Sequence, residues 1–367
     1  MQTLREIRTK QNLAVAGYLI TVGFVFTIGF MLLRFPENAG RGVSKGVELS
    51  LGTLIPSMFP FMLLSTFTVN SGILERLSFL SDKLTQKLFR LPGVCAAVIL
   101  FSMTGGLPIG PKMTADLYAR GYITLSQGQR MLFFCMNPGP AFVITAVGYY
   151  MLGSERSGLI LYVSVLLSSV IIGILSSFVW GDGTEFIKAL SDKREKYSLQ
   201  SALQDALVQS GRNMLTVCGW VIIFSCLTEL VSVLPLGQGG KDFVCAVLEM
   251  TNGCDVLSGS YPVPLIAGVI GFGGICAHMQ VMSSVMKLKL KLKYFICARI
   301  LNGGLAVLIA MLLLELFPVS AQTFAMGTLP ERRENIFSVP LGTGILVMCF
   351  LLMLGENFSF KRMQKKR

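Results

Sequence analysis

The stretch LPGVCAAVILFSMTGGLPIGPKMTAD, Leu91–Asp116, decides the fold that the sequence predicts. It begins as an apolar helix and is then interrupted by three glycines and two prolines between residues 105 and 111. These residues cannot all lie in one continuous α-helix. A weaker counterpart, PLIAGVIGFGGICAHMQVMSS, occupies Pro264–Ser284. At membrane depth a broken helix is tolerated only where protein buries it or where it lines a cavity, so each stretch is a candidate binding site.

The composition predicts a polytopic membrane protein. Of the 367 residues, 53% are apolar and only 14% are charged, and the mean hydropathy is +0.65. Soluble domains carry about 25% charged residues. The net charge of +12 collects in short loops and at the termini, which favours the positive-inside bias of membrane proteins over a nucleic-acid partner. The nine cysteines lack C-x-x-C pairs and favour buried thiols, and the single histidine excludes a multi-histidine metal site.

Apolar runs predict an all-α protein with about ten membrane segments. They are residues 12–33, 49–69, 94–110, 131–152, 159–180, 214–234, 243–257, 263–286, 294–317 and 336–354. Two of them, 94–110 and 243–257, are short for the roughly 20 residues that a full span needs, and whether they span or re-enter stays open. Residues 73–90 predict an amphipathic helix on the membrane surface. The basic C-terminal tail and the N-terminal arginines predict that both termini are cytoplasmic.

The chain is predicted to hold two repeats with discontinuous or re-entrant helices. The SMTGGLPIGPK run at 102–112 aligns with IGFGGICAHMQ at 270–280, and an asparagine–glycine break follows in the next segment of each half. The predicted organisation is an anchor span and loop (1–48), a first repeat (49–180), a charged linker with an amphipathic helix (181–212), a second repeat (213–318), and a loop with the last span and a basic tail (319–367). Chance similarity between apolar segments is the alternative. Paired broken helices point to the central site of a transporter, although the sequence does not say whether the repeats are inverted.

The broken helices supply the candidate substrate-binding residues. These are Gly105, Gly106, Pro108, Gly110, Lys112, Asn137, Asn252, Gly273, Gly274 and Asn302. A half-helix N-terminus presents free N–H groups and about half a positive charge, so two opposed ends would suit a planar dianion. The alternatives are close helix packing for the glycines, snorkelling to the interface for Lys112, and helix capping for the two asparagines in the breaks.

Acidic residues at membrane depth are costly and mark ion or proton pathways. Glu249 and Thr251 are therefore predicted to bind a coupling proton or a sodium ion, and His278 is a candidate proton relay or a buried core residue. Arg299 is predicted to reach lipid headgroups, with steering of the substrate as the second interpretation, and Asp255 is predicted to lie near an aqueous end. No catalytic residue, metal or resident cofactor is predicted.

Leu91–Tyr150 resembles the sporulation integral membrane (YlbJ-like) proteins, which carry a nucleoside-recognition or "gate" domain. The resemblance rests on SMTGGLPIGPKMTADLYARG, MNPGPAFVITAVG, LEMTNG and GFGGICAHMQV, and it extends in order from about residue 49 to 318. It implies an α-helical protein of the membrane around the forespore, distantly similar to nucleoside transporters. It also implies transport of dipicolinic acid from the mother cell towards the forespore.

These observations favour a transporter or facilitator of a small organic anion, with dipicolinate as the best substrate, working by alternating access. One alternative is a nucleoside or nucleobase transporter, and another is a non-transporting membrane module that gates or docks a sporulation complex. The chain contains no nucleophile elbow, phosphate-binding loop or H-E-x-x-H motif, so an enzyme is not predicted. The expected partners are the lipid bilayer, the anionic substrate, and a second copy or other sporulation membrane proteins.

Overall fold

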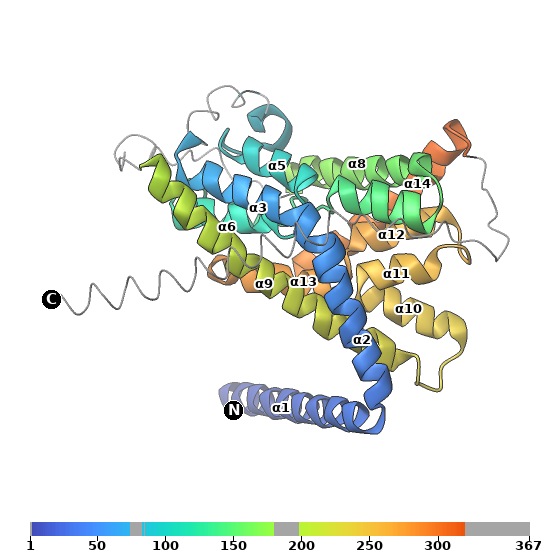
Figure 1. Ribbon diagram of the computed structural model, residues 1–367. Coiled ribbons are helices and arrows are strands. Elements are labelled where there is room, and N and C mark those ends of the chain that lie inside the picture. The colour runs from blue at the N-terminus through green and yellow to red at the C-terminus, as the bar shows by residue number, and fades with distance from the viewer. Residues whose placement is uncertain (1, 74–82, 84, 180–197, 320–367) are drawn as a thin grey trace, which may run out of the picture.

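Figure 1 shows the computed structural model, which describes residues 2–73, 83, 85–179 and 198–319. Within these ranges the chain is helical and contains no strand, as the sequence predicted. The main helices are α1 (Gln2–Arg34), α2 (Pro36–Leu49), η1 (Ser50–Leu54), α3 (Ile55–Asn70), α5 (Cys95–Thr104), α6 (Ile109–Ala119), α7 (Leu125–Met131), η2 (Ala141–Met151), α8 (Glu155–Val179), α9 (Leu199–Val231), α10 (Gln238–Leu248), α11 (Met250–Leu257), α12 (Val263–Phe272), α13 (Gly274–Ser284) and α14 (Leu292–Leu316). Most of the predicted surface helix, most of the linker, and the last span with its tail lie outside the described residues.

The protein is a multi-pass integral membrane protein. In the described part, α8, α9, α14 and the pair α12–α13 are long and apolar enough to cross a membrane. The bent pair α2–α3 makes five if it counts as one span. About ten membrane segments were expected. The described part does not confirm that number. Two of the predicted segments fold back as pairs of short helices, the apolar helices within residues 12–33 and 131–152 are shorter than a full span, and residues 336–354 lie outside the described part.

The expected loop before residue 48 is instead helix α2, which packs along α9. A Cβ at Gly42 would lie 2.6 Å from the Cα of Cys226, and one at Gly46 would lie 2.7 Å from the Cα of Ile222. Two glycines four residues apart therefore let the two backbones touch, as small residues do in membrane helix pairs. The loop prediction was wrong, because the glycines of this segment are packing residues of a helix. Helix α1 extends away from the bundle (Figure 1).

The chain bends by 58° between α2 and α3. The bend coincides with η1, a short stretch of π-helical hydrogen bonds, and with Pro56 and Pro60 at the start and in the interior of α3. Proline lacks the N–H of the helical ladder and clashes with the preceding turn, which accounts for the kink.

Helices α5 and α6 form a hairpin whose tip is Gly105–Pro108. Gly106 has a φ of +99°, a left-handed conformation that favours glycine. Just past the tip, a Cβ at Gly110 would lie only 2.6 Å from the Cβ of Ser102. The short segment 94–110 therefore turns back instead of crossing as one helix.

Helices α10 and α11 form a second hairpin, with Glu249 at its tip in an extended conformation. Gly253 on α11 faces Ala246 on α10 so closely that a Cβ would lie 2.5 Å from the Ala246 Cα. At the open end, the Tyr261 hydroxyl donates to Asp242 Oδ2 at 3.0 Å. The predicted segment 243–257 thus lies in two short helices that turn back at Glu249, and neither is long enough to cross a membrane alone.

Two further helices are broken without folding back. One break, Asn137–Pro140, separates α7 from η2, and the other, at Gly273, separates α12 from α13. The long helices α8 and α14 lie side by side, with η2 packed on α8 and α12 packed on α14 (Figure 1). The core of the bundle lies between these four elements.

Both halves place their elements in the same order: an outer helix (α3 or α9), a hairpin, a broken helix and a straight helix (α8 or α14). The predicted residue alignment is therefore wrong in one respect. Residues 102–112 form a hairpin tip, whereas residues 270–280 hold the break of α12–α13. Residues 199–212 of the predicted linker are the first turns of α9.

Candidate functional site

The two hairpin tips and the two helix breaks line one cavity. Its empty space, including the open mouth, is about 690 Å³. The lining residues are Leu54, Met58, Phe61, Thr104, Gly105, Gly106, Leu107, Pro138, Gly139, Pro140, Ala141, Phe142, Val217, Val221, Glu249, Met250, Thr251, Gly273, Cys276, Ala277 and Gln280. The first residues of η2 and α11, Ala141 and Met250, are among them, and so is Gly273, the residue that precedes α13.

The cavity separates the predicted site residues into two groups. Gly105, Gly106, Glu249, Thr251 and Gly273 line it. The others lie behind its wall or away from it: Pro108, Gly110, Lys112, Asn137, Asn252, Gly274, His278 and Asn302. The glycine motifs therefore lie at the cavity, while several of the polar residues near them hold the structure around it.

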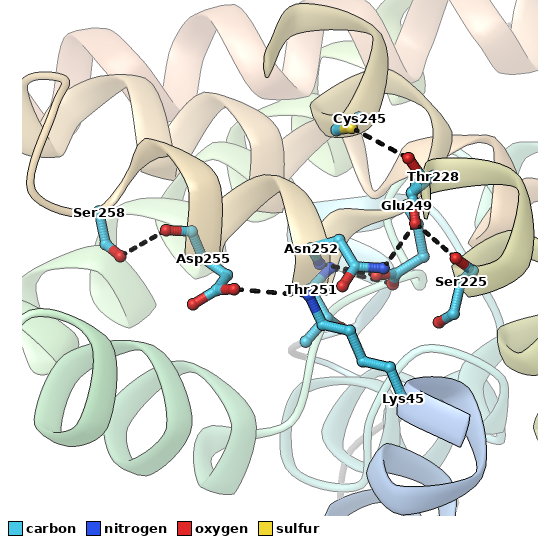
Figure 2. Close-up of polar contacts among 9 residues, drawn as sticks. All are labelled: Lys45, Ser225, Thr228, Cys245, Glu249, Thr251, Asn252, Asp255 and Ser258. Carbon is cyan, nitrogen blue, oxygen red and sulfur yellow. Dashed lines mark hydrogen bonds and ion pairs between the residues drawn. The ribbon is translucent and has the colours of Figure 1, made fainter. Parts of the chain in front are cut away.

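Glu249 caps helix α11 at the second hairpin tip (Figure 2). Its two carboxylate oxygens accept hydrogen bonds from the backbone N–H groups of Thr251 at 3.0 Å and Asn252 at 2.7 Å. The side chain is only 4% exposed although it borders the cavity. A negative charge at a helix N-terminus is stabilised by the unpaired N–H groups and the helix dipole. The cap thus compensates the positive end of α11 and fixes the tip.

Asn252 ties the same tip to α9. Its Nδ2 donates to Thr228 Oγ1 at 3.1 Å, and that hydroxyl donates to the carbonyl of Ser225 at 2.9 Å (Figure 2). Asp255 lies on the exposed side of α11 and pairs with Lys45 of α2 at 3.6 Å. Asp255 is thus solvent-exposed in the structure, and Asn252 holds the hairpin rather than facing the cavity.

Four of the predicted residues have local structural contacts. A Cβ at Gly110 would lie 2.0 Å from the Cys135 carbonyl oxygen, so this glycine is where the first hairpin meets the segment after α7. Lys112 Nζ pairs with Asp116 Oδ1, one helical turn further along α6, at 2.5 Å. Pro108 precedes the first residue of α6, and Gly274, with a φ of +72°, lies against the backbone of the second hairpin tip.

Asn137, at the break before η2, and Asn302, on α14, meet in the middle of the bundle. The asparagine–glycine break expected at Asn302 is wrong, because α14 runs continuously from Leu292 to Leu316. Ser169 of α8 donates to Asn137 Oδ1 at 2.5 Å and accepts a hydrogen bond from Asn302 Nδ2 at 3.2 Å. Asn137 also donates to the Phe134 carbonyl at 2.9 Å, and Asn302 donates to the Gly271 carbonyl at 3.3 Å. All three side chains are fully buried. Through these hydrogen bonds the three side chains connect the Phe134 carbonyl, before the first break, with the Gly271 carbonyl, before the second break.

The prediction that Arg299 reaches lipid headgroups is wrong. Its side chain has no exposed area, and its Nε donates to the Phe272 carbonyl at 3.2 Å while Nη2 donates to that of Gly271. His278 hydrogen-bonds the Phe272 carbonyl too, at 3.0 Å, and its ring packs between Phe272 and Phe295. Both side chains hold the C-terminal end of α12 at the break. The packing of α14 on its neighbours places Arg299 inside the bundle. The lysines close to it in the sequence had favoured a position at the lipid headgroups.

Two polar cavity residues, Thr104 and Gln280, were not predicted. Gln280 lies on the same face of α13 as Gly273, Cys276 and Ala277, at the i, i+3, i+4, i+7 spacing of one helix face. That spacing, counted from the break, is the signal that could have found it. The sequence indicates the burial of Arg299 more strongly than it indicates Gln280, because a charged residue inside an apolar run faces protein or a cavity by default.

Comparison with known proteins agrees with this architecture. Residues 51–181 match a family model described as Gate, nucleoside recognition. The chain is 24% identical over 342 residues to the sporulation integral membrane protein YlbJ of Bacillus subtilis (strain 168), a match that covers 82% of this chain and 84% of that protein. No solved structure matches the chain. The chain is therefore similar over most of its length to the YlbJ-like integral membrane proteins, and the match to the Gate model lies in its first half.

Proposed function

We propose that this protein transports a small organic anion by alternating access around the cavity between its two hairpins, and that dipicolinate is the substrate during sporulation. The observation that carries the proposal is the convergence of both hairpin tips and both helix breaks on one cavity. Discontinuous helices whose N-termini point at a shared site are how many transporters bind anionic groups. The name of the Bacillus subtilis relative supports a sporulation context.

The chemistry of the cavity favours a partly apolar anion. Phe61, Phe142 and Met58 offer apolar and aromatic surface, while the backbone at Gly106 and Gly139 offers polar groups without side chains in the way. Such a lining suits a ring that carries carboxylates at its edge, which is the form of dipicolinate. Transport of this kind uses no resident cofactor.

We assign coupling to the second hairpin tip. Glu249 and Thr251 border the cavity, and the Glu249 carboxylate holds the first turn of α11. Uptake of a proton would weaken this cap, because a neutral carboxyl is a poorer acceptor and a weaker partner for the helix end. A sodium ion near the same carboxylate is the other coupling candidate. His278 faces the α12 carbonyl instead of the cavity, so it has no part in this assignment.

The proposed setting is the membrane around the forespore, with both termini in the mother-cell cytoplasm. The lysines at 289, 291 and 293 between α13 and α14 support this orientation by the positive-inside rule. A second copy or other sporulation membrane proteins are the proposed partners within that membrane.

The test is the dipicolinate content of spores whose sole copy carries Gly106→Leu or Glu249→Gln, measured by terbium fluorescence. Gly304→Ala, at an α14 position with open space around it, is the matched control. We expect low spore dipicolinate in the two site variants, with normal membrane levels on a blot and normal synthesis in the mother cell. Normal dipicolinate in both site variants would refute the assignment.

Proteoliposome uptake of radiolabelled dipicolinate separates the alternatives, with uridine as competitor. Uridine uptake without dipicolinate uptake would favour a nucleoside transporter. Uptake of neither, together with loss of sporulation in the variants, would favour a membrane module that docks a partner.

A further inference from the structure

Arg299 on α14 is a buried cation at the break of α12–α13. Its side chain has no exposed area, and Nε and Nη2 donate to the carbonyls of Phe272 and Gly271, the last two residues of α12. The third guanidinium nitrogen, Nη1, is buried and has no hydrogen-bond partner.

The charge of Arg299 is only partly compensated. No carboxylate among the described residues lies within ion-pair distance of it. The carbonyl end of α12 contributes about half a negative charge through the helix dipole, so a substantial positive charge is left over. Burying a charge without a partner is strongly destabilising, which argues that an anion joins this site in the working protein.

The Arg299 guanidinium lies next to Gly273, a residue of the cavity wall. A Cβ at Gly273 would lie 3.6 Å from Arg299 Nη2, and Gly273 is part of the cavity wall. The N-terminus of α13 starts at the next residue, so its free N–H groups add to the positive potential on this side. At the opposite tip, the N-terminus of α11 is already compensated by Glu249. The two sides of the cavity therefore differ in charge.

We infer that Arg299 is a specificity-determining residue that makes the α13 side of the cavity select a carboxylate. The guanidinium acts through the wall at Gly273, where a glycine leaves no side chain between the charge and the cavity. It also positions the break by holding both α12 carbonyls. This inference rests on the proposed function for the identity of the ligand, but the charge asymmetry can be measured without any substrate.

The first experiment measures the electrostatic potential in the cavity with a thiol introduced at Ala277. This lining residue's Cβ lies 3.9 Å from the place that a Cβ at Gly273 would occupy. Ala277→Cys is labelled in proteoliposomes with an anionic and a cationic methanethiosulfonate of similar size, and the ratio of the two rates is measured by peptide mass spectrometry. The native Cys276, which also lines the cavity, serves as a second reporter. We expect Arg299→Met to lower the anionic-to-cationic rate ratio about tenfold, and Arg299→Lys to keep it. An unchanged ratio in Arg299→Met would overturn the inference.

The second experiment reads selectivity with purified protein in nanodiscs. Dipicolinate and its neutral diamide are compared by equilibrium binding to the unsubstituted protein, Arg299→Lys, Arg299→Met and Arg299→Gln, with thermal unfolding as the folding control. We expect the neutral variants to lose about tenfold in dipicolinate affinity and little in diamide affinity. Equal losses for both ligands would reduce Arg299 to a structural residue. If the unsubstituted protein binds neither ligand, the dipicolinate proposal fails while the thiol reporters still decide the charge inference.

Discussion

The substitution Gly110→Ala should separate a packing role from a substrate-binding role at the first hairpin. A Cβ there would lie 2.0 Å from the Cys135 carbonyl oxygen and 2.6 Å from the Cβ of Ser102. Ordinary contact begins near 3.4 Å, so the hairpin and the segment after α7 would have to separate by more than 1 Å. Both neighbours are buried, and the atom closest to the new methyl group is backbone. Overpacking of this kind costs about 1–3 kcal/mol, and we expect the upper part of that range.

The assay is unfolding of the purified protein by SDS in mixed micelles, with Gly304→Ala as the control. The control position has nothing within 4 Å of a new Cβ and lies within α14, so alanine should be neutral or slightly stabilising there. We expect Gly110→Ala to unfold at a clearly lower SDS fraction than the control. If the two variants unfold together while Gly110→Ala loses transport, Gly110 acts on the substrate and the packing argument is wrong.

Three further predictions use the same unfolding assay. Asn302→Leu should cost about 3 kcal/mol, because it removes three buried hydrogen bonds, to Ser168, Ser169 and the Gly271 carbonyl, at about 1 kcal/mol each; a loss below 1 kcal/mol would mean that water replaces the side chain. Gly46→Leu should push α2 off α9 and destabilise by about 1–3 kcal/mol, whereas Gly40→Leu, which meets nothing within 4 Å, should not; equal effects would contradict the close packing. Lys45→Ala should change stability by less than about 1 kcal/mol, because Lys45 and Asp255 are both well exposed, and a larger loss would indicate that the pair latches the second hairpin.

The segments that line the cavity could be predicted from the sequence because helix breaks are local. Glycine and proline at Gly105–Pro108, Asn137–Pro140 and Gly273 disfavour a continuous helix whatever surrounds them. All three breaks supply residues to the cavity. The acidic residue at membrane depth, Glu249, was informative for the same reason, since its cost in an apolar run does not depend on the fold.

The difference between a hairpin and a broken span could not be predicted, because it depends on contacts between distant residues. Gly110 and Gly253 each sit where a second backbone comes within van der Waals distance, and neither neighbour can be read from local sequence. Gly273 has an equally strong breaking signal, yet α13 continues beyond it as part of one span. The same limit explains Arg299, whose burial follows from the packing of α12 on α14 and not from its sequence neighbours.

The polar chain through Ser169 bears on which parts of the molecule move. It joins Asn137, at the break before η2, to Asn302 on α14 by buried hydrogen bonds, so separating these two residues would break those hydrogen bonds inside the protein. The hairpin tips lack such a connection to each other in the described structure and meet across the cavity. We therefore expect the core of α8 and α14 to stay fixed while the tips move. Hydrogen exchange in nanodiscs should show faster exchange at residues 105–107 and 249–251 than at residues 300–304, and slower exchange at the tips when dipicolinate is added. Faster exchange at 300–304 than at the tips would place the moving element in the core instead, because it would mean that the buried hydrogen bonds of Asn302 open before the cap of Glu249 does.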